Sequence, residues 1–287
     1  MKGNYTMKKA KIILLTGQSN AVGVGHCQYL PAYFSPEKVQ EYTRGYENIR
    51  INYYSHDKKS DGFVKTGLNC TELTKNTFGP EVGIAEVLTQ KYPDEQFFIV
   101  KCAYGGTCLW HDWISPASGD EYDADAHDDA QIPEHYRSFG WCYNELGKIL
   151  PDSIKALEEQ GYTPEIIAFL WMQGEGDADT PEHVAEYERR YKALLADIHT
   201  NFGAYFSGDC VYVDGGISEI WTLYRELNEV KRAYAAKTPN SFYLNTIGAG
   251  LTTLNEPQPE PDIYHYDAGS TIKLGHMFAQ HINGGKA

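Results

Sequence analysis

The chain has 287 residues, 42% of them hydrophobic and 22% charged, which is enough for one large folded domain with a substantial core. The formal net charge of −14 argues against nucleic acid or an anionic membrane as a partner, because both repel an acidic surface. No stretch of the sequence approaches the roughly 20 consecutive apolar residues of a membrane-spanning helix. The composition therefore predicts a globular protein that is not bound to membranes.

The amino-terminal segment 1–11 is polar and basic, and the apolar run that follows is too short for a secretion signal. None of the six cysteines has the spacing of a zinc knuckle or of a CxxC redox motif. The acidic segment 120–129 lacks the glycine and the final glutamate of an EF-hand, so we expect a solvated loop there. We accordingly expect buried free thiols, a cytoplasmic location and no metal or other cofactor.

Continuously apolar runs rich in β-branched and aromatic residues are typical of strands that are buried on both faces of a parallel sheet. In chain order these runs are 11–16, 97–102, 166–172, 211–214 and 242–245. Segments with helical periodicity lie between and after them. They cover 80–91, 142–160, 180–202, 223–236 and 269–282, and Pro151 could divide the second of them.

The alternation of strands and helices predicts one doubly wound α/β domain over residues 1–287, with right-handed crossovers. Residues 25–75 and 111–140 lack clear periodicity, and we expect them to be loop insertions. In an open α/β sheet such loops line the crevice at the carboxyl ends of the strands, where ligands bind.

The sequence Gly17-Gln18-Ser19-Asn20 directly follows the first expected strand. A serine at this point enters a turn or a helix N-terminus, where backbone N–H groups can donate to an oxyanion. Position 21 is alanine, so the motif is not the G-x-S-x-G elbow. A serine or asparagine here also suits a helix cap, so the motif alone leaves both interpretations open.

Asp262 lies three residues before His265, just ahead of the last expected helix. A histidine base needs a partner that fixes its tautomer and stabilises the imidazolium formed during acyl transfer. A carboxylate at this spacing can reach the ring, although many isolated pairs of this kind are ordinary surface residues.

Two more polar segments follow expected strands, Trp171–Asp177 and Tyr104–Thr107. The amide of Gln173 can donate to an oxyanion, and glycines at a strand end let backbone N–H groups approach a ligand. Each segment alone could be an ordinary turn. Their common position at the ends of strands predicts that they share one crevice.

These segments together resemble the SGNH hydrolase superfamily, and within it the sialate O-acetylesterase-like branch that includes the carbohydrate esterase family 6 acetyl xylan esterases. The matching segments, in the family's order, are GQSN (17–20), FGPE (78–81), YGGTCL (104–109), WMQGEGD (171–177) and DIYH (262–265). The resemblance spans residues 11–282. It implies a flavodoxin-like three-layer α/β/α sandwich with a central parallel sheet, and metal-independent ester hydrolysis.

The resemblance also implies roles for individual residues. Ser19 would be the nucleophile, His265 the base and Asp262 the acid that orients it. Glu175 is a rival or supporting acid, because some relatives use this glutamate. The oxyanion donors would be the backbone N–H groups of Ser19 and of Gly105 or Gly106, and the side chain of Gln173. The candidates for substrate contact are Gln18, Asn20, Trp110, Asp112 and Trp113.

The expected function is that of a serine esterase which removes O-acetyl groups from a carbohydrate, such as an acetylated xylooligosaccharide, through an acyl-enzyme intermediate. A sialate O-acetylesterase and a lipid or thioester hydrolase remain alternatives, and a non-catalytic carbohydrate-binding protein is a third. The acidic composition disfavours an anionic sialate unless Arg44, Arg50 or Arg137 forms a basic pocket.

Overall fold

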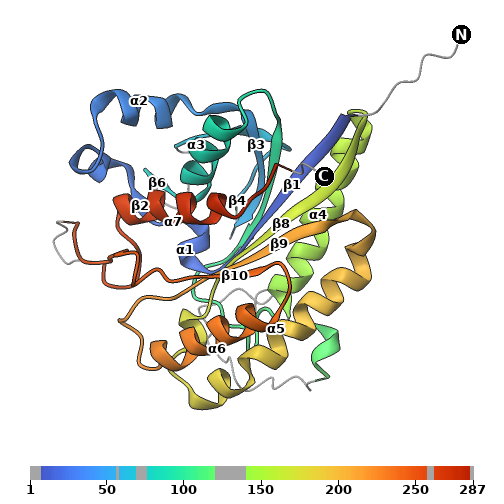
Figure 1. Ribbon diagram of the computed structural model, residues 1–287, viewed down its shortest axis with the longest axis vertical. Coiled ribbons are helices and arrows are strands. Elements are labelled where there is room, and N and C mark those ends of the chain that lie inside the picture. The colour runs from blue at the N-terminus through green and yellow to red at the C-terminus, as the bar shows by residue number, and fades with distance from the viewer. Residues whose placement is uncertain (1–7, 56–57, 69–75, 120–139, 257–261, 285–287) are drawn as a thin grey trace, which may run out of the picture.

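The computed structural model describes residues 8–55, 58–68, 76–119, 140–256 and 262–284. Its centre is a twisted sheet in the strand order β10-β9-β8-β1-β7-β3-β4, with β5 paired to β3 beside this path (Figure 1). The strands of the sheet are β1 (Lys8–Gly17), β3 (Tyr46–Ser55), β4 (Lys58–Lys59), β5 (Val64–Thr66), β7 (Phe97–Ala103), β8 (Tyr162–Met172), β9 (Phe206–Gly215) and β10 (Ser241–Leu244). Two short strands, β2 (Gly25–His26) and β6 (Thr77–Phe78), form a separate pair.

The order of the strands creates a switch point beside β1. From β1 the chain places β3 and β7 on one side of the sheet, and then returns to place β8, β9 and β10 on the other. In the parallel register Gly17 lies level with Ala103 of β7 and with Met172 of β8, so the three strands end together. Ligands of open α/β sheets bind outside the carboxyl ends of the strands at such a point.

Helices cover both faces of the sheet (Figure 1). They are α1 (Ser19–Val22), α2 (Pro36–Arg44), α3 (Glu81–Lys91), α4 (Trp141–Glu159), α5 (Pro181–Phe202), α6 (Tyr224–Lys237) and α7 (Ala268–Gln280). Helices α3 and α7 pack against each other on one face, and α4, α5 and α6 lie on the other. Short 3-10 helices occur at η1 (Cys27–Ala32), η2 (Pro116–Ser118), η5 (Glu175–Asp177) and η6 (Gly203–Tyr205).

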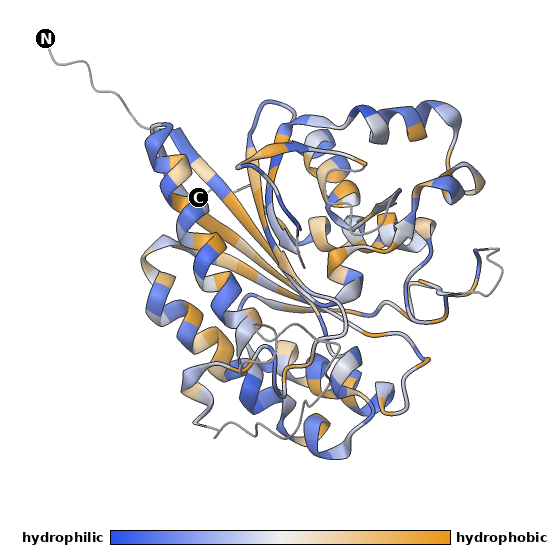
Figure 2. Cartoon of the chain, turned by 180° about the vertical axis from the view of Figure 1, so that it is seen from behind, coloured by the Kyte–Doolittle hydropathy of each residue, from blue (hydrophilic) through white to orange (hydrophobic). Residues whose placement is uncertain are grey.

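The hydropathy of the chain follows this layering. The central strands are hydrophobic over most of their length, and the helices expose polar residues on their outer sides (Figure 2). Every residue of β7 is buried, as a strand covered on both faces requires. The prediction of a three-layer α/β/α sandwich with a mainly parallel sheet is confirmed, and the five expected strands correspond to β1, β7, β8, β9 and β10.

Two sequence predictions are corrected by the structure. Residues 25–75 are not merely an inserted loop, because they contain β3, which pairs in parallel with β7. The burial of β3 is irregular and mixes exposed with buried residues, so it lacks the continuous apolar run of the other strands. Pro151 does not divide α4, where it lies exposed, so solvent can reach the carbonyl group that loses its helical hydrogen bond.

Much of the second expected insertion, residues 120–139, lies outside the described residues, and so does the acidic segment within it. In the part of the chain that the structure describes, no helix is long and apolar enough to cross a membrane. The same residues contain no group of three or more metal-binding side chains placed to hold a metal ion. Cys102, Cys108, Cys142 and Cys210 are buried free thiols, as predicted, whereas Cys27 is free but only partly buried.

Candidate active site

The turn that carries Ser19 depends on a glycine at the end of β1. Gly17 has φ +135°, and a Cβ atom there would lie 2.0 Å from the carbonyl oxygen of Met172. The next residue, Gln18, donates its backbone N–H to that same oxygen at 2.8 Å. This close contact turns the chain directly into α1, whose first residue is the partly exposed Ser19. The first N–H groups of a helix have no acceptor within the helix, so they are available to an oxyanion.

The loop after β7 lies against this turn. Tyr104 donates its backbone N–H to the carbonyl oxygen of Gly17 at 3.1 Å, and Gly105 and Gly106 follow at the surface. Gly106 has φ +70°, which favours glycine. The backbone N–H groups of this loop and of Ser19 therefore belong to neighbouring turns.

His265 and Asp262 form a close pair in the loop before α7. The Nδ1 atom of His265 lies 2.6 Å from Oδ2 of Asp262, and the other carboxyl oxygen accepts the backbone N–H groups of Tyr264 and His265 at 3.0 and 3.2 Å. The hydrogen bond from His265 holds the pKa of Asp262 below its usual value. Both side chains are partly exposed, at 24% for His265 and 33% for Asp262. The carboxylate is placed to fix the ring with Nε2 on its free side.

Asn20 joins the serine turn to the histidine loop. Its Oδ1 accepts the backbone N–H of Tyr266 at 3.1 Å, and its Nδ2 donates to Glu175 at 2.8 Å. Ser19 directly precedes Asn20, and His265 directly precedes Tyr266. The hydrogen bond between Asn20 and Tyr266 therefore links the two turns. No direct hydrogen bond joins the Ser19 and His265 side chains among the interactions of the described residues, and such catalytic contacts often tighten only when substrate binds.

Glu175, in η5 after β8, makes its side-chain hydrogen bond with Asn20 and not with the histidine. It is 1% exposed, one carboxyl oxygen accepts the bond from Asn20, and the other has no hydrogen-bond partner in the described part of the chain. Asp262 is thus the carboxylate in contact with His265. Among the hydrogen bonds of the described residues, Glu175 is joined to the histidine loop through Asn20.

The contacts of Gln173 differ from those expected of an oxyanion donor. Its side chain is fully buried, and its amide nitrogen donates to Asp177 at 2.6 Å, with the carbonyl oxygen of Thr107 at 3.3 Å. The amide oxygen accepts a hydrogen bond from Tyr187 at 2.8 Å. Both ends of this amide are therefore occupied by the protein. Gln173 holds loops together in this structure, so of the expected oxyanion donors the backbone N–H groups remain as candidates.

Asp177 organises the loop after β7. Its two oxygens accept the backbone N–H groups of Leu109 and Trp110 at 2.8 and 3.0 Å, in addition to the amide of Gln173. Burial raises the pKa of Asp177 to about 6. The segment from Gln173 to Asp177 thus fixes the shape of the glycine loop beside Ser19.

A buried ion pair supports the carboxyl end of α1. Nζ of Lys101, in β7, lies 2.8 Å from Glu81 and donates to the carbonyl oxygen of Val22, the last residue of α1, at 2.5 Å. The other oxygen of Glu81 accepts the backbone N–H of Gly79 at 3.0 Å. Both charged side chains are 0% exposed. Sequence analysis missed this role, although a lysine inside an apolar strand and the glutamate of FGPE were visible signals.

A second buried lysine supports the loop after β8. Lys231, in α6, lies 2.8 Å from Asp214 of β9 and donates to the carbonyl oxygens of Gln173 and Gly215. The sequence gives little indication of this pair, because the two residues lie on different elements. The α1 turn and the loop after β8 are thus each held by hydrogen bonds from a buried lysine.

The expected substrate contacts fall into two groups. Three of them are buried and hold loops, namely Gln18, Asn20 and Asp112. The amide oxygen of Gln18 accepts hydrogen bonds from the backbone N–H groups of Gly174 and Gly176. The carboxylate of Asp112 accepts hydrogen bonds from the backbone N–H of Cys108 and the indole N–H of Trp141. Trp113 is 0% exposed and donates its indole N–H to Thr107, so its burial argues against the contact that we expected.

Trp110 alone among these candidates has a partly exposed side chain. It stacks on His183 with ring centroids 4.4 Å apart, and the guanidinium of Arg190 lies 3.8 Å from its ring centre. These contacts fix the orientation of the indole, which remains a candidate for substrate contact.

The chain matches the family model described as "Carbohydrate esterase, sialic acid-specific acetylesterase" over residues 9–283. It belongs to this family. The match covers nearly the whole chain and includes all the residues that meet at the switch point, and it makes the protein a carboxylic ester hydrolase. No curated protein sequence matches the chain.

Solved structures agree on the fold. A protein of Arabidopsis thaliana is 18% identical, with 95% of this chain and 97% of that chain covered and a TM-score of 0.62. NanS is 13% identical, with coverages of 96% and 97% and a TM-score of 0.65. A carbohydrate acetylesterase from Xanthomonas citri is 15% identical and has a TM-score of 0.55, with 94% of this chain and 55% of that chain covered. At these identities the likeness concerns the fold alone.

Proposed function

We propose that the protein is a serine esterase that removes acetyl groups from a neutral carbohydrate, with Ser19 as nucleophile, His265 as base and Asp262 as its orienting acid. The observation that carries this proposal is the Asp262–His265 contact at 2.6 Å, in a loop that Asn20 ties to the Ser19 turn. Family membership supports the acetyl ester as substrate.

In the proposed reaction His265 takes the proton of Ser19 as Oγ attacks the acetyl carbonyl carbon. The negative charge that develops on the carbonyl oxygen is stabilised by backbone N–H groups of Ser19 and of Gly105 or Gly106. His265 then protonates the oxygen of the leaving sugar, and the acetyl group stays on Ser19. Water attacks this acyl-enzyme with His265 again as base, and acetate leaves.

The positions of two arginines support a neutral sugar over an anionic one. Arg44 ends α2, and Arg50 lies in β3 level with Phe98, near the start of β7. Both therefore lie toward the amino ends of the strands, away from Ser19 at the carboxyl end of β1. Arg50 also lies 3.8 Å from Glu47. Arg137 lies outside the described residues.

Replacing Ser19 tests the nucleophile. We expect Ser19→Ala to lower kcat for acetate release from an acetylated xylooligosaccharide by at least about 10³-fold, because the acyl-enzyme cannot form. A fluorophosphonate that labels activated serines should add one adduct to the wild-type protein and none to the variant, as measured by intact mass. Ser207→Ala, at the amino end of β9, is the matched control. Full activity in Ser19→Ala, or labelling of it, would show that another residue is the nucleophile.

A further inference from the structure

Two aromatic rings lie beside His265 that the proposed catalytic steps do not use. Tyr264 directly precedes the histidine and is 51% exposed. Trp221, from the loop after β9, packs on it with ring centroids 5.4 Å apart and an angle of 42° between the rings. The adjoining Ile220 is 42% exposed. Apolar side chains that gather at the surface next to a site mark a place where a ligand binds.

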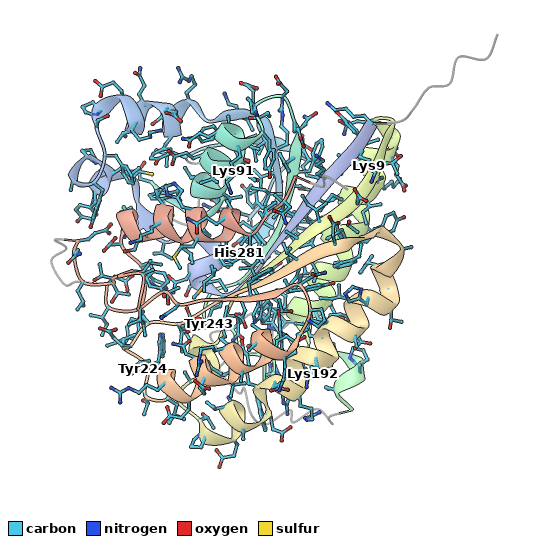
Figure 3. All side chains as sticks on the ribbon, viewed as in Figure 1. Lys9, Lys91, Lys192, Tyr224, Tyr243 and His281 are labelled. Atoms are coloured by element: carbon cyan, nitrogen blue, oxygen red, sulfur yellow. The ribbon has the colours of Figure 1, made fainter. Side chains whose placement is uncertain are left out.

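The Trp221 loop is fixed to the part of the chain that follows Asp177. Leu223 donates its backbone N–H to the carbonyl oxygen of Ala178 at 2.7 Å, and Thr222 donates to the side chain of Asp179 at 3.2 Å. In Figure 3 the labelled Tyr224, which begins α6, lies at the opposite end of the sheet from Lys9 in β1. The loop that holds Trp221 therefore lies at the carboxyl edge, where the site residues meet.

Tyr264 is fixed by the catalytic carboxylate itself. Its backbone N–H donates to Oδ1 of Asp262, whose Oδ2 contacts the histidine ring. Tyr264 and His265 thus belong to one hydrogen-bonded turn. Tyr264 therefore directly precedes the base within the turn that holds it.

The chemistry of ester cleavage decides which half of the substrate lies on this side. His265 must protonate the oxygen of the leaving alcohol, so the alcohol lies toward the histidine. The acyl group lies toward the N–H groups of the oxyanion hole. In a sugar acetate the alcohol is the sugar ring, so the ring lies on the side of Tyr264.

We infer that Tyr264 and Trp221 form a stacking platform for the sugar ring that bears the acetyl group, an inference that rests on the proposed function. The face of a pyranose carries C–H groups, which suit the electron-rich face of an aromatic ring, while its hydroxyl groups point outward to water. The exposed Glu219 lies in the same loop as Trp221, and Asp179 accepts a hydrogen bond from Thr222 of that loop. Their charges favour a neutral ring over an anionic one. Both aromatic residues bind substrate and take no part in proton transfer.

The experiment compares two acetyl esters that differ in the alcohol. One is an acetylated xylooligosaccharide and the other is ethyl acetate, whose alcohol is too small to stack. We expect Tyr264→Ala and Trp221→Ala to lower the ratio of kcat/KM for the sugar ester to that for ethyl acetate about tenfold, mainly through KM. Tyr264→Phe, which keeps the ring, should restore most of the ratio.

Phe242→Ala is the matched control, because Phe242 is also an exposed aromatic residue packed on another ring, that of His281, away from the catalytic loops. It should leave the ratio unchanged. An unchanged ratio in Tyr264→Ala, or an equal loss on both esters, would overturn the platform while leaving the esterase intact. Should Trp221→Ala fail to fold, as judged by its Tm, the half-exposed Tyr264 decides the question.

Failure of the proposed function looks different from failure of the platform. A wild-type protein that hydrolyses ethyl acetate but none of the sugar acetates would refute the carbohydrate substrate, and the platform with it. A wild-type protein that hydrolyses both esters, with variants that keep the wild-type ratio, refutes only the platform.

Discussion

Asp262 and Glu175 are both carboxylates of the proposed site, and their contacts assign them different tasks. Asp262 contacts the ring of His265 directly at 2.6 Å, whereas Glu175 contacts only the amide of Asn20 at 2.8 Å. A carboxylate in contact with the imidazole fixes its tautomer and stabilises the imidazolium. The hydrogen bond of Glu175 reaches the histidine loop through Asn20, so we expect this carboxylate to act on the position of that loop.

Paired isosteric variants test this division. We expect Asp262→Asn to lower kcat for ester hydrolysis on the order of 10³- to 10⁴-fold, because the neutral amide neither fixes the tautomer nor stabilises the imidazolium. Glu175→Gln should cost roughly tenfold, since it weakens one hydrogen bond to Asn20. Steady-state kinetics on one acetyl ester, with thermal unfolding as a check on folding, measures both effects. A larger loss in Glu175→Gln than in Asp262→Asn would reverse the assignment of the acid.

At the level of elements, the turn that carries Ser19 depends on how closely β1 approaches β8. The two strands end level at Gly17 and Met172, and the chain must then turn sharply into α1. A side chain at position 17 would have to occupy the space of the Met172 carbonyl group. The position of Ser19 is therefore coupled to the packing of the central strands.

Glycine-to-alanine substitutions at two sites distinguish the backbone constraint at Gly17 from the usual effect of such a substitution in a helix. Gly17→Ala should lower the free energy of unfolding by roughly 3 kcal/mol or more, because it combines a φ of +135° with a clash against backbone. Gly147→Ala, at an exposed site in α4 with open space around it, should raise the free energy of unfolding by about 0.4–1 kcal/mol. Urea unfolding measures both. A Gly17→Ala protein as stable as wild type would mean that β1 and β8 can separate without cost.

The last helix places the base in a comparable way. Helix α7 packs closely on α3, where Gly83 and Gly275 face each other: a Cβ on Gly83 would lie 2.2 Å from the carbonyl oxygen of Ile272, and one on Gly275 2.2 Å from that of Pro80. Asp267 caps the start of α7 by accepting the N–H of Ser270 at 2.7 Å. The loop that holds His265 ends at this anchored helix.

For the molecule as a whole, the net charge of −14 sets the field that an incoming substrate meets. Repulsion between like charges lowers the rate at which an anionic substrate reaches the site, and salt screens it over a Debye length of about 10 Å. The charge thus affects acetylated sialic acid and leaves a neutral sugar acetate unaffected.

The dependence of activity on salt distinguishes these substrates. Between about 20 and about 200 mM NaCl we expect kcat/KM for an acetylated sialic acid to rise severalfold, because salt screens the repulsion. For an acetylated neutral sugar it should stay constant, which makes that substrate the control. A fall in kcat/KM with salt for the sialic acid would instead show that a local basic pocket attracts it, and would favour the sialate alternative.

The fold class and the family could be predicted from the sequence, because each rests on local patterns. The strands buried on both faces appear as continuous apolar runs, and the serine, histidine and glutamine motifs are each contiguous. Strand β3 could not be found in this way, because its burial is irregular and its apolar residues form no continuous run. Pro151 misled the prediction of α4, because the cost of a proline in a helix depends on whether its site is exposed.

The sequence by itself determined the type of fold, the family and the set of residues that meet at the switch point. Only the tertiary structure decided how these residues divide the work. It placed Asp262 on the histidine, tied Glu175 to Asn20, occupied both ends of the Gln173 amide and set Tyr264 against Trp221. The physical reason is that each of these roles depends on a contact between segments far apart in the chain, or on which of several nearby acceptors a side chain reaches, and neither leaves a pattern in local sequence.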